Sequence, residues 1–146
     1  MTDFLRPAAD LYTSGQPSPQ ELSALASEGV RTIIDLRGAD EQSGFEEATE
    51  AERLGMRYVR IPITGAQDLV PDTIARFSRE LAEARHTGPV LNHCGGANRA
   101  GAMLALDAGI THGVPRDAAL SLGRKGGLTA LEPAVEALLR GSGKPR

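Results

Sequence analysis

Apolar residues in this chain fall into two alternating patterns. Short, nearly continuous runs rich in Val, Ile, Leu and Tyr are typical of buried strands. Between and after these runs, apolar residues recur every three or four positions, which is typical of amphipathic helices. The predicted strands are LYTSG (11–15), VRTIIDLR (30–37), MRYVRIPI (56–63) and PVLNHC (89–94), and the predicted helices are 18–29, 43–55, 71–88, 99–108, 115–122 and 129–140.

The alternation of strands and helices predicts parallel strands joined by crossover helices that cover both faces of one sheet. We therefore expect an α/β fold with three layers, α/β/α, around a central four-stranded, mostly parallel sheet. Residues 1–146 are expected to form one domain with a flexible C-terminal tail at about 141–146. Two helices carry a predicted capping box at their start, formed by Ser18 with Glu21 and by Thr129 with Glu132.

Composition limits the classes of partner. The 146 residues carry a formal net charge of −3, which argues against general binding to nucleic acid or to an anionic membrane surface. The single cysteine excludes an internal disulfide and suits a reducing compartment. The N-terminus lacks the pattern of a signal peptide, so we expect a cytoplasmic protein. The spacing of His, Asp and Glu predicts no metal site, and we expect no cofactor.

The segment HCGGANRAG (93–101) follows the last predicted strand directly. In parallel sheets, ligands bind beyond the carboxyl ends of the strands, where Cys94 is expected to lie. Gly95 and Gly96 can take positive φ, so successive backbone N–H groups can turn inward into an anion-binding nest. The following helix start adds unpaired N–H groups, and Arg99 adds a planar fork for two oxygens of an oxyanion.

The same donors favour the thiolate form of Cys94. A thiolate beside an oxyanion cradle is suited to attack on phosphorus or on a transferable sulfur. The alternative is that Cys94 is an inert buried residue and that Gly95 and Gly96 form a plain turn. The coincidence of a strand end, a glycine loop, a helix start and an arginine favours the reactive interpretation.

This segment resembles the signature loop of the cysteine-dependent protein tyrosine and dual-specificity phosphatases. More closely, LYTSGQPSPQELSALASEGVRTIIDLR, LGMRYVRIPI and VLNHCGGANRAGAMLAL are similar, in order and spacing, to blocks of the bacterial phosphatase-like family attached to beta-lactamase hydrolase-like proteins. The resemblance implies a dual-specificity phosphatase-like fold and hydrolysis of phosphate monoesters through a phosphocysteine. It implies Cys94 as nucleophile, Arg99 as phosphate clamp and His93 tuning the thiolate from behind the loop. The implied ligands are a phosphorylated protein or small molecule, and oxyanions such as phosphate or sulfate.

Two departures from the ordinary phosphatase pattern keep other functions open. Only four residues separate Cys94 from Arg99, whereas ordinary tyrosine phosphatases have five; the shorter loop matches the bacterial subfamily and also the rhodanese-type sulfurtransferases. Ala100 stands where phosphatases usually carry a Ser or Thr that stabilises the departing thiolate. The alternatives are therefore a sulfurtransferase with a persulfide on Cys94, and a weakly active module that binds phosphorylated ligands.

The general acid of such a phosphatase is an Asp on the loop after the third predicted strand. Asp68 and Asp72 are the choices, and neither lies at the usual short offset from the strand. Asp68 is the candidate because Asp72 is expected to cap the next helix. A solvated loop carboxylate is the alternative for Asp68.

Several polar residues are candidates to bind the phosphate group. Gln16 either lines the pocket or is a turn residue. Arg37 either adds positive potential to the site or forms a surface ion pair. Asn98 either orients the loop or contacts the substrate. The full set of candidate phosphate-binding residues is Gln16, Arg37, His93, Gly95, Gly96, Ala97, Asn98 and Arg99.

Overall fold

The structure is a computed structural model that describes residues 2–142. Over these residues the chain forms one sheet of five strands in the order β1-β2-β5-β3-β4. The strands are β1 (Leu5–Ala8), β2 (Leu11–Ser14), β3 (Thr32–Asp35), β4 (Arg57–Arg60) and β5 (Val90–His93). Strands β2 to β5 are the four predicted strands, and they are parallel to one another.

Strand β1 was not predicted, so the sheet has one strand more than expected. It pairs antiparallel with β2 at the edge of the sheet. Pro7 lies within β1, and a proline inside a strand argues against a strand from sequence alone because it cannot donate to the ladder. An edge strand tolerates this loss, which explains both the position of β1 and the missed prediction.

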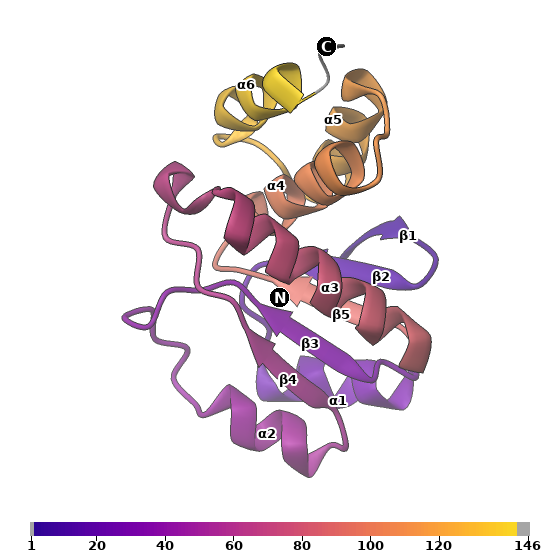
Figure 1. Cartoon of the computed structure of the whole chain (residues 1–146). Coiled ribbons are helices and arrows are strands. Elements are labelled where there is room, and N and C mark those ends of the chain that lie inside the picture. Colours follow the sequence, from indigo (N-terminus) through magenta and orange to yellow (C-terminus); the bar gives the residue numbers. More distant parts are fainter. Residues whose placement is uncertain (1, 143–146) are drawn as a thin grey trace.

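Helices cover both faces of the sheet, which confirms the three-layer α/β/α architecture (Figure 1). Helices α1 and α2 lie on one face, and α3 and α4 lie on the other, with α5 and α6 packed beyond α4. A 3₁₀ turn precedes α3, and a π-helical turn extends α4. The helical elements are α1 (Pro19–Ser27), α2 (Glu47–Arg53), η1 (Ala66–Asp68), α3 (Pro71–Thr87), α4 (Asn98–Leu106), η2 (Asp107–Thr111), α5 (Arg116–Lys125) and α6 (Glu132–Ser142).

The core divides between the two faces because side chains alternate along each strand. Ile33 and Leu91 belong to the cluster that includes Leu22 of α1. Their neighbours along the strands point the other way: Ile34 belongs to the cluster that includes Phe77 of α3. All five side chains are fully buried. Near-continuous apolar strands of this kind need a helical layer on each side.

The predicted helix starts have different outcomes. The capping box of Ser18 and Glu21 is confirmed at the start of α1. The box predicted for Thr129 and Glu132 is wrong, because the Thr129 hydroxyl bonds Asn98 and the Glu132 carboxylate accepts from Arg124.

The ends of α3 and α6 also differ from expectation. The N-cap of α3 is Val70, so Asp72 lies in the first turn and does not cap the helix, contrary to the prediction. Helix α6 runs through Ser142 and so extends into the predicted tail, 141–146; the rest of that tail, 143–146, lies outside the described residues. Within residues 2–142, no helix combines the length and the apolar character needed to cross a bilayer.

The register of the parallel strands brings their carboxyl ends level with one another. His93 at the end of β5 pairs with Ser14 of β2 on one side and with Asp35 of β3 on the other, and Asp35 pairs with Arg60 of β4. The loops that follow these strands therefore meet at one edge of the sheet. Cys94 follows β5, the third of the five strands across the sheet, so it lies near the centre of that edge.

Candidate active site

Cys94 begins a loop that is held by the strands on both sides of β5. Its backbone N–H donates to the Ser14 carbonyl at 3.2 Å, and the Leu36 N–H donates to the His93 carbonyl at 2.9 Å. The cysteine is fully buried, whereas the next two residues, Gly95 and Gly96, are exposed. The thiol therefore lies below an exposed loop rim and is fixed in position by the sheet.

The loop makes its turn at Ala97 and not at the glycines. Ala97 has a φ of 72°, in the left-handed region, and Asn98 then begins α4. Gly95 and Gly96 do not adopt the left-handed conformation that the sequence allows them. A left-handed residue followed by a right-handed helical one is the backbone pairing of an anion-binding nest, so the predicted type of turn is present at a different residue.

Gly95 allows two side chains to lie close to the backbone of the loop. A Cβ added there would lie 3.0 Å from Arg99 Nη2 and 3.3 Å from Glu41 Oε1. A larger residue would therefore push the arginine and the glutamate away from the loop. The glycine lets a guanidinium and a carboxylate lie directly against the backbone that follows Cys94.

Glu41 holds the guanidinium of Arg99 in one orientation. Arg99 Nη1 donates to Glu41 Oε2 at 2.6 Å and Nη2 donates to Glu41 Oε1 at 2.7 Å. Nη1 also donates to the Ile63 carbonyl at 2.8 Å. These three bonds tie α4, the loop after β3 and the loop after β4 together at the site. Bidentate Arg–carboxylate pairs fix both distance and plane.

Glu41 and Arg99 each stabilise the ionised form of the other. The hydrogen bonds from Arg99 lower the pKa of Glu41 to about 2, so this carboxylate stays ionised over the whole range in which the folded protein would be assayed. The pKa of Arg99 is raised, first by its hydrogen bonds to Glu41 and further by the side chain of Cys94. The guanidinium is therefore a permanent positive charge beside the thiol.

His93 lies behind the loop, between its backbone and a buried acid. Its Nδ1 is 3.3 Å from the Cys94 carbonyl oxygen, and its Nε2 is 2.6 Å from Glu47 Oε2. Both His93 and Glu47 are buried. The imidazole is thus held at both nitrogens, and one of the two contacts reaches the backbone of the cysteine itself.

Arg37 does not form the surface ion pair considered from the sequence; it belongs to the same buried cluster. Its Nε and Nη2 bond both oxygens of Asp35, and Nη2 lies 3.3 Å from Glu47 Oε1. Burial alone would raise the pKa of Asp35, but Arg37, His93 and Tyr58 outweigh it and hold the value at about 2. The Arg37 guanidinium is therefore paired with these two acids.

One group of donor atoms within the described residues has the composition of a metal site. Single donor atoms of Asp35, Glu47 and His93 all lie within 4.8 Å of one another. The carboxylates already accept hydrogen bonds from Arg37, Gln16 and Tyr58. Arg37 contributes one positive charge against the two carboxylates, and the group is an ion-pair cluster.

Asp68 lies on the predicted loop, at the end of η1. Its Oδ2 accepts from the Thr64 N–H at 2.8 Å and from the Thr64 hydroxyl at 2.7 Å. These bonds lower the pKa of Asp68. Thr64 follows Ile63, whose carbonyl binds Arg99, so this loop is tied to the site. In the observed arrangement the Asp68 carboxylate accepts its hydrogen bonds from within its own loop.

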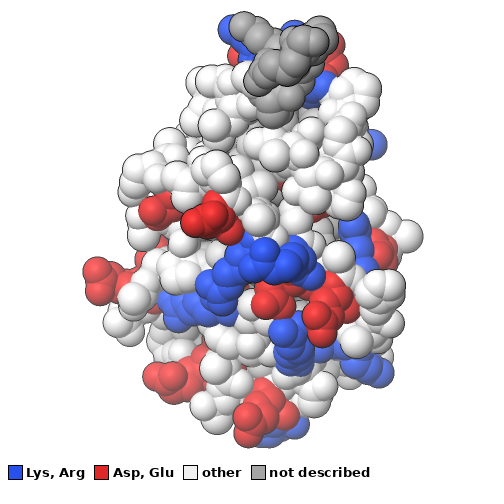
Figure 2. Space-filling model, in the orientation of Figure 1, with Lys and Arg blue, Asp and Glu red and all other residues white. Residues whose placement is uncertain are grey.

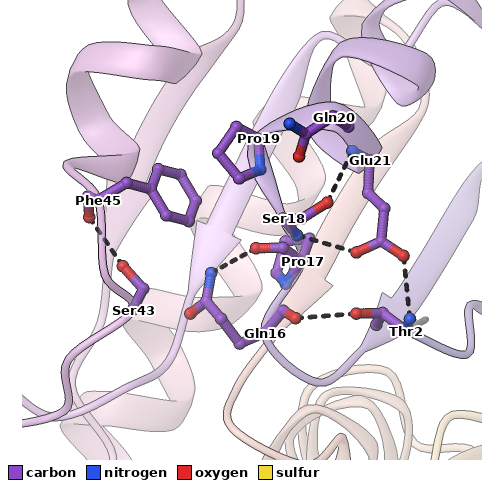
Figure 3. Close-up of a pocket in the computed structure, with 9 residues that line it drawn as sticks. All are labelled: Thr2, Gln16, Pro17, Ser18, Pro19, Gln20, Glu21, Ser43 and Phe45. Atoms are coloured by element: carbon purple, nitrogen blue, oxygen red, sulfur yellow. Dashed lines mark hydrogen bonds between the residues drawn. The ribbon is translucent and has the colours of Figure 1, made fainter.

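Gln16 lies at the edge of the Cys94 loop and also reaches the buried cluster. Its Nε2 donates to Glu47 Oε1 at 2.9 Å and to the Pro17 carbonyl. It lines a hollow of about 470 Å³ together with Gly95, Gly96 and Ala97. A neighbouring hollow of about 730 Å³ shares Gln16 and continues towards the start of α1, where the Phe45 ring faces Pro19 (Figure 3). The surface beside the loop is thus concave over both hollows.

Asn98 anchors the loop to the C-terminal helices. Its Oδ1 accepts from the backbone N–H groups of Thr129 and Leu131 and from the Thr129 hydroxyl. The side-chain carbonyl is therefore directed to the connection between α5 and α6. Of the two roles considered from the sequence, this geometry matches orientation of the loop.

Two residues of the site, Glu41 and Glu47, were not predicted from the sequence. Glu41 is one of several acids in a polar loop, and its position four residues after Arg37 at a strand end was the only available signal. Glu47 stands in FEEATEAER among glutamates of the same type, and only its burial separates it from exposed Glu46.

The surface around the sheet carries both signs of charge. On the face shown in Figure 2, basic and acidic side chains lie next to one another over the sheet and α2, below a mostly uncharged surface. Such interspersed charge gives no broad positive field on that face.

Residues 5–124 match the family described as "DSP-PTPase phosphatase fused to NAD+ Kinase". The chain belongs to this family. The cysteine, the arginine and the loop between them thus stand in a fold whose family is that of the dual-specificity phosphatases, and the family predicted from the sequence is confirmed.

Curated relatives of this phosphatase family agree with the match. The chain is 36% identical over 121 residues to a beta-lactamase hydrolase-like protein of Xylella fastidiosa, covering 80% of this chain and 27% of that protein. It is 29% identical over 126 residues to the dual specificity protein phosphatase TpbA of Pseudomonas aeruginosa, covering 86% of this chain and 55% of that protein. The chain therefore spans about half the length, or less, of these relatives.

Solved structures share the fold of this phosphatase-family chain. A putative phosphatase from Shewanella putrefaciens has a TM-score of 0.75 at 25% identity, covering 95% of this chain and 89% of that one. TpbA of P. aeruginosa has a TM-score of 0.72 at 25% identity, covering 94% and 83%. A second TpbA structure, in complex with phosphotyrosine, has a TM-score of 0.70 at 22% identity, covering 97% and 89%, which shows the common fold.

Proposed function

We propose that this chain is a cysteine-dependent phosphatase that hydrolyses phosphate monoesters. The observation that carries the proposal is the pairing of a buried thiol, Cys94, with a guanidinium that Glu41 holds beside it. The family match supports the reaction type, because the same fold is that of the dual-specificity phosphatases. The sulfurtransferase and the weakly active module that binds phosphorylated ligands, both considered from the sequence, are not favoured by these relatives.

The geometry suits the first half of such a reaction. The Cys94 thiolate attacks phosphorus, the S–P bond forms as the P–O bond to the leaving group breaks, and the leaving oxygen takes up a proton. Arg99 Nη1 donates to Glu41 and to Ile63, and Nη2 gives one hydrogen to Glu41. Nε–H and the second Nη2–H share one edge of the guanidinium, which fits two phosphoryl oxygens. The backbone N–H groups of Gly95 to Asn98 are proposed to bind the oxygens as well.

The second half of the reaction returns the enzyme to its starting state. A water molecule attacks the phosphocysteine, the S–P bond breaks, and inorganic phosphate leaves with Cys94 again a thiolate. In our proposal Asp68 gives its proton to the leaving oxygen and then takes one from this water. For this role its carboxyl must exchange the bonds to Thr64 for the substrate oxygen.

The substrate is proposed to be a phosphorylated side chain of a protein. The support is the dual specificity phosphatase named among the relatives and the complex of its structure with phosphotyrosine. The hollow beside Gly95 and Gly96 offers room for the body of such a substrate next to the phosphate position. We propose a cytoplasmic location because a catalytic thiol persists best under reducing conditions.

A matched pair of assays tests the proposed reaction. Phosphate release from an aryl phosphate and thiocyanate formation from thiosulfate plus cyanide are measured on the same preparation of the wild-type chain. We expect phosphate release and no thiocyanate above the level without protein. Thiocyanate formation without phosphate release would show a sulfurtransferase and would contradict the proposal.

Replacing Asp68 by asparagine tests the general acid. Because the acid assists departure of the alcohol, Asp68→Asn is expected to lower kcat for phosphotyrosine by roughly 10²-fold or more, and to lower kcat less for an aryl phosphate with an acidic leaving group. Asp72→Asn is the matched control, since Asp72 lies nearby in the first turn of α3. Equal losses for both leaving groups would remove Asp68 from the mechanism.

Replacing Gly127 by alanine tests the shape of the Cys94 loop. Gly127 has a φ of 108°, and a Cβ there would lie 2.6 Å from the Ala97 Cβ and 2.9 Å from its carbonyl oxygen. We expect Gly127→Ala to displace Ala97 and to lower kcat/KM by about 10–100-fold, since small misplacements of catalytic groups are costly.

Gly29→Ala is the control for backbone strain, because Gly29 has a φ of 105° and nothing within 4 Å of the added Cβ. Both variants are expected to lose about 1–2 kcal/mol of stability from the left-handed conformation. Only Gly127→Ala should lose activity. Equal activities of the two variants would show that contact with Ala97 does not shape the site.

A further inference from the structure

A buried cluster of four charged or titratable side chains lies under the Cys94 loop. Asp35, Arg37, Glu47 and His93 are each at most 4% exposed. Two carboxylates and one guanidinium leave one negative charge uncompensated, and an unpaired charge is expensive to bury. His93 is the group that balances the cluster if its imidazole carries a positive charge.

The hydrogen bonds of His93 point to the same charge state. Nδ1 faces the Cys94 carbonyl oxygen at 3.3 Å, and Nε2 faces Glu47 Oε2 at 2.6 Å. A carbonyl and a carboxylate are both acceptors, and a neutral imidazole has a single N–H with which to satisfy one of them. An imidazole protonated at both nitrogens satisfies both contacts.

Glu47 is suited to hold this second proton on the ring. Its other oxygen, Oε1, lies 3.3 Å from Arg37 Nη2 and accepts from Gln16 Nε2 at 2.9 Å. Donors on that oxygen favour the ionised carboxylate over the acid, so the proton between Glu47 and His93 belongs on the imidazole. The acid is the first residue of α2.

We propose that Glu47 is a positioning residue that keeps His93 as an imidazolium, with its charge beneath the Cys94 thiolate. This inference rests on the proposed function, in which Cys94 is the nucleophile. The ring lies between Glu47 and the Cys94 carbonyl, so its positive charge is nearer to the loop than the negative charge of Glu47 is. The pair therefore favours the thiolate, and the buried acid contributes to reactivity without touching the substrate.

The other charged groups around the ring leave this arrangement intact. Asp35 Oδ1 is 3.8 Å from His93 Nε2, and its carboxylate is held by Arg37 and by the Tyr58 hydroxyl. On the side of the sulfur, Arg99 is paired with Glu41. With the pKa of Asp35 and that of Glu41 both at about 2, these acids keep their charge where a cysteine titrates. Loss of the Glu47 charge therefore removes the carboxylate that accepts from His93 Nε2.

The wild-type chain gives the first test, which depends on no variant. Nitrogen-15 NMR of the His93 ring at neutral pH is expected to show both nitrogens protonated. A spectrum of a neutral ring with one protonated nitrogen would overturn the inference, whatever the activity of the protein. This readout concerns the imidazole alone, so it is independent of whether Cys94 performs catalysis.

The second test measures how pH controls alkylation of Cys94 by iodoacetamide. In the wild type we expect a midpoint well below the value of ~8.5 for an ordinary thiol. Glu47→Gln keeps the size and an acceptor atom but removes the charge, and we expect it to raise the midpoint by about one pH unit. At pH values below both midpoints this is about a tenfold slower alkylation. Glu46→Gln is the matched control, because Glu46 is exposed and caps α2 without a side-chain hydrogen bond.

The outcomes separate this inference from the proposed function. An ordinary midpoint in the wild type, with no phosphate release, would count against the proposed function. A depressed midpoint that Glu47→Gln leaves unchanged would overturn the role of Glu47 alone. In a His93→Gln background, adding Glu47→Gln is expected to cause no further shift; a further shift of similar size would show that Glu47 acts without His93.

Discussion

Replacing Cys94 by serine is expected to abolish hydrolysis of aryl phosphates, with a loss in kcat of at least about 10⁴-fold. A serine hydroxyl is not ionised under conditions in which a thiolate forms, so the variant has no anionic nucleophile for Arg99 and the loop N–H groups to stabilise. The substitution exchanges sulfur for oxygen at a fully buried position, where little space has to change. Steady-state kinetics with an aryl phosphate is the measurement.

The control for Cys94→Ser is ligand binding, because the oxyanion cradle is expected to survive. The variant should still bind an inert oxyanion such as tungstate, as measured by calorimetry, and should unfold at a temperature close to that of the wild type. Activity that persists in the serine variant would show that the thiol is not the nucleophile. Loss of both activity and oxyanion binding would show instead that the cysteine shapes the cradle.

Replacing Arg99 by lysine is expected to lower kcat/KM by about 10³-fold. Lysine keeps the charge but cannot make two parallel bonds to a phosphoryl group while also holding both oxygens of Glu41 and the Ile63 carbonyl. The geometry, and not the charge alone, is therefore what the substitution removes. Both kcat and KM should change, because the guanidinium contacts the bound substrate and the transition state.

Arg124→Lys is the matched control for this substitution. Arg124 also makes a two-pronged pair with a carboxylate, that of Glu132, but on the surface of α5. Exposed pairs of this kind contribute little to stability, so the control should behave as the wild type. A loss of less than about tenfold in Arg99→Lys would show that a simple positive charge is sufficient and that the fork geometry is not used.

Much of the fold was predictable because the signals are local. Runs such as VRTIIDLR are apolar enough to require burial on both faces, and the crossover rule then sets the parallel order. The position of Cys94 followed from the same reasoning, since the residue after the last strand must lie at the carboxyl edge of the sheet. The antiparallel strand β1 was not predicted, because Pro7 removes the usual sequence signal of a strand and because an edge strand needs only one partner.

The finer features of the site depend on tertiary contacts that no local pattern records. The sequence pointed to the glycines of the loop as left-handed residues, yet Ala97 adopts that conformation and Gly127 packs against it from a distant loop. The sequence left Arg37 open between a source of positive potential and a surface ion pair, yet Asp35 and Glu47 hold it in a buried cluster. Which of two adjacent glutamates is buried is decided only when α2 packs beside the sheet.

The most direct measurement of the central claim is intact-mass spectrometry of the wild-type chain, quenched in acid at short times during turnover of an aryl phosphate. The account predicts a protein species heavier by one phosphoryl group, with the group on Cys94 and absent from Cys94→Ser. Ala100 is buried and provides no hydroxyl to assist breakdown of the phosphocysteine, which favours its accumulation. Turnover in which the mass of the protein stays unchanged at every time, with equal activity in Cys94→Ser, would contradict a covalent mechanism at this cysteine.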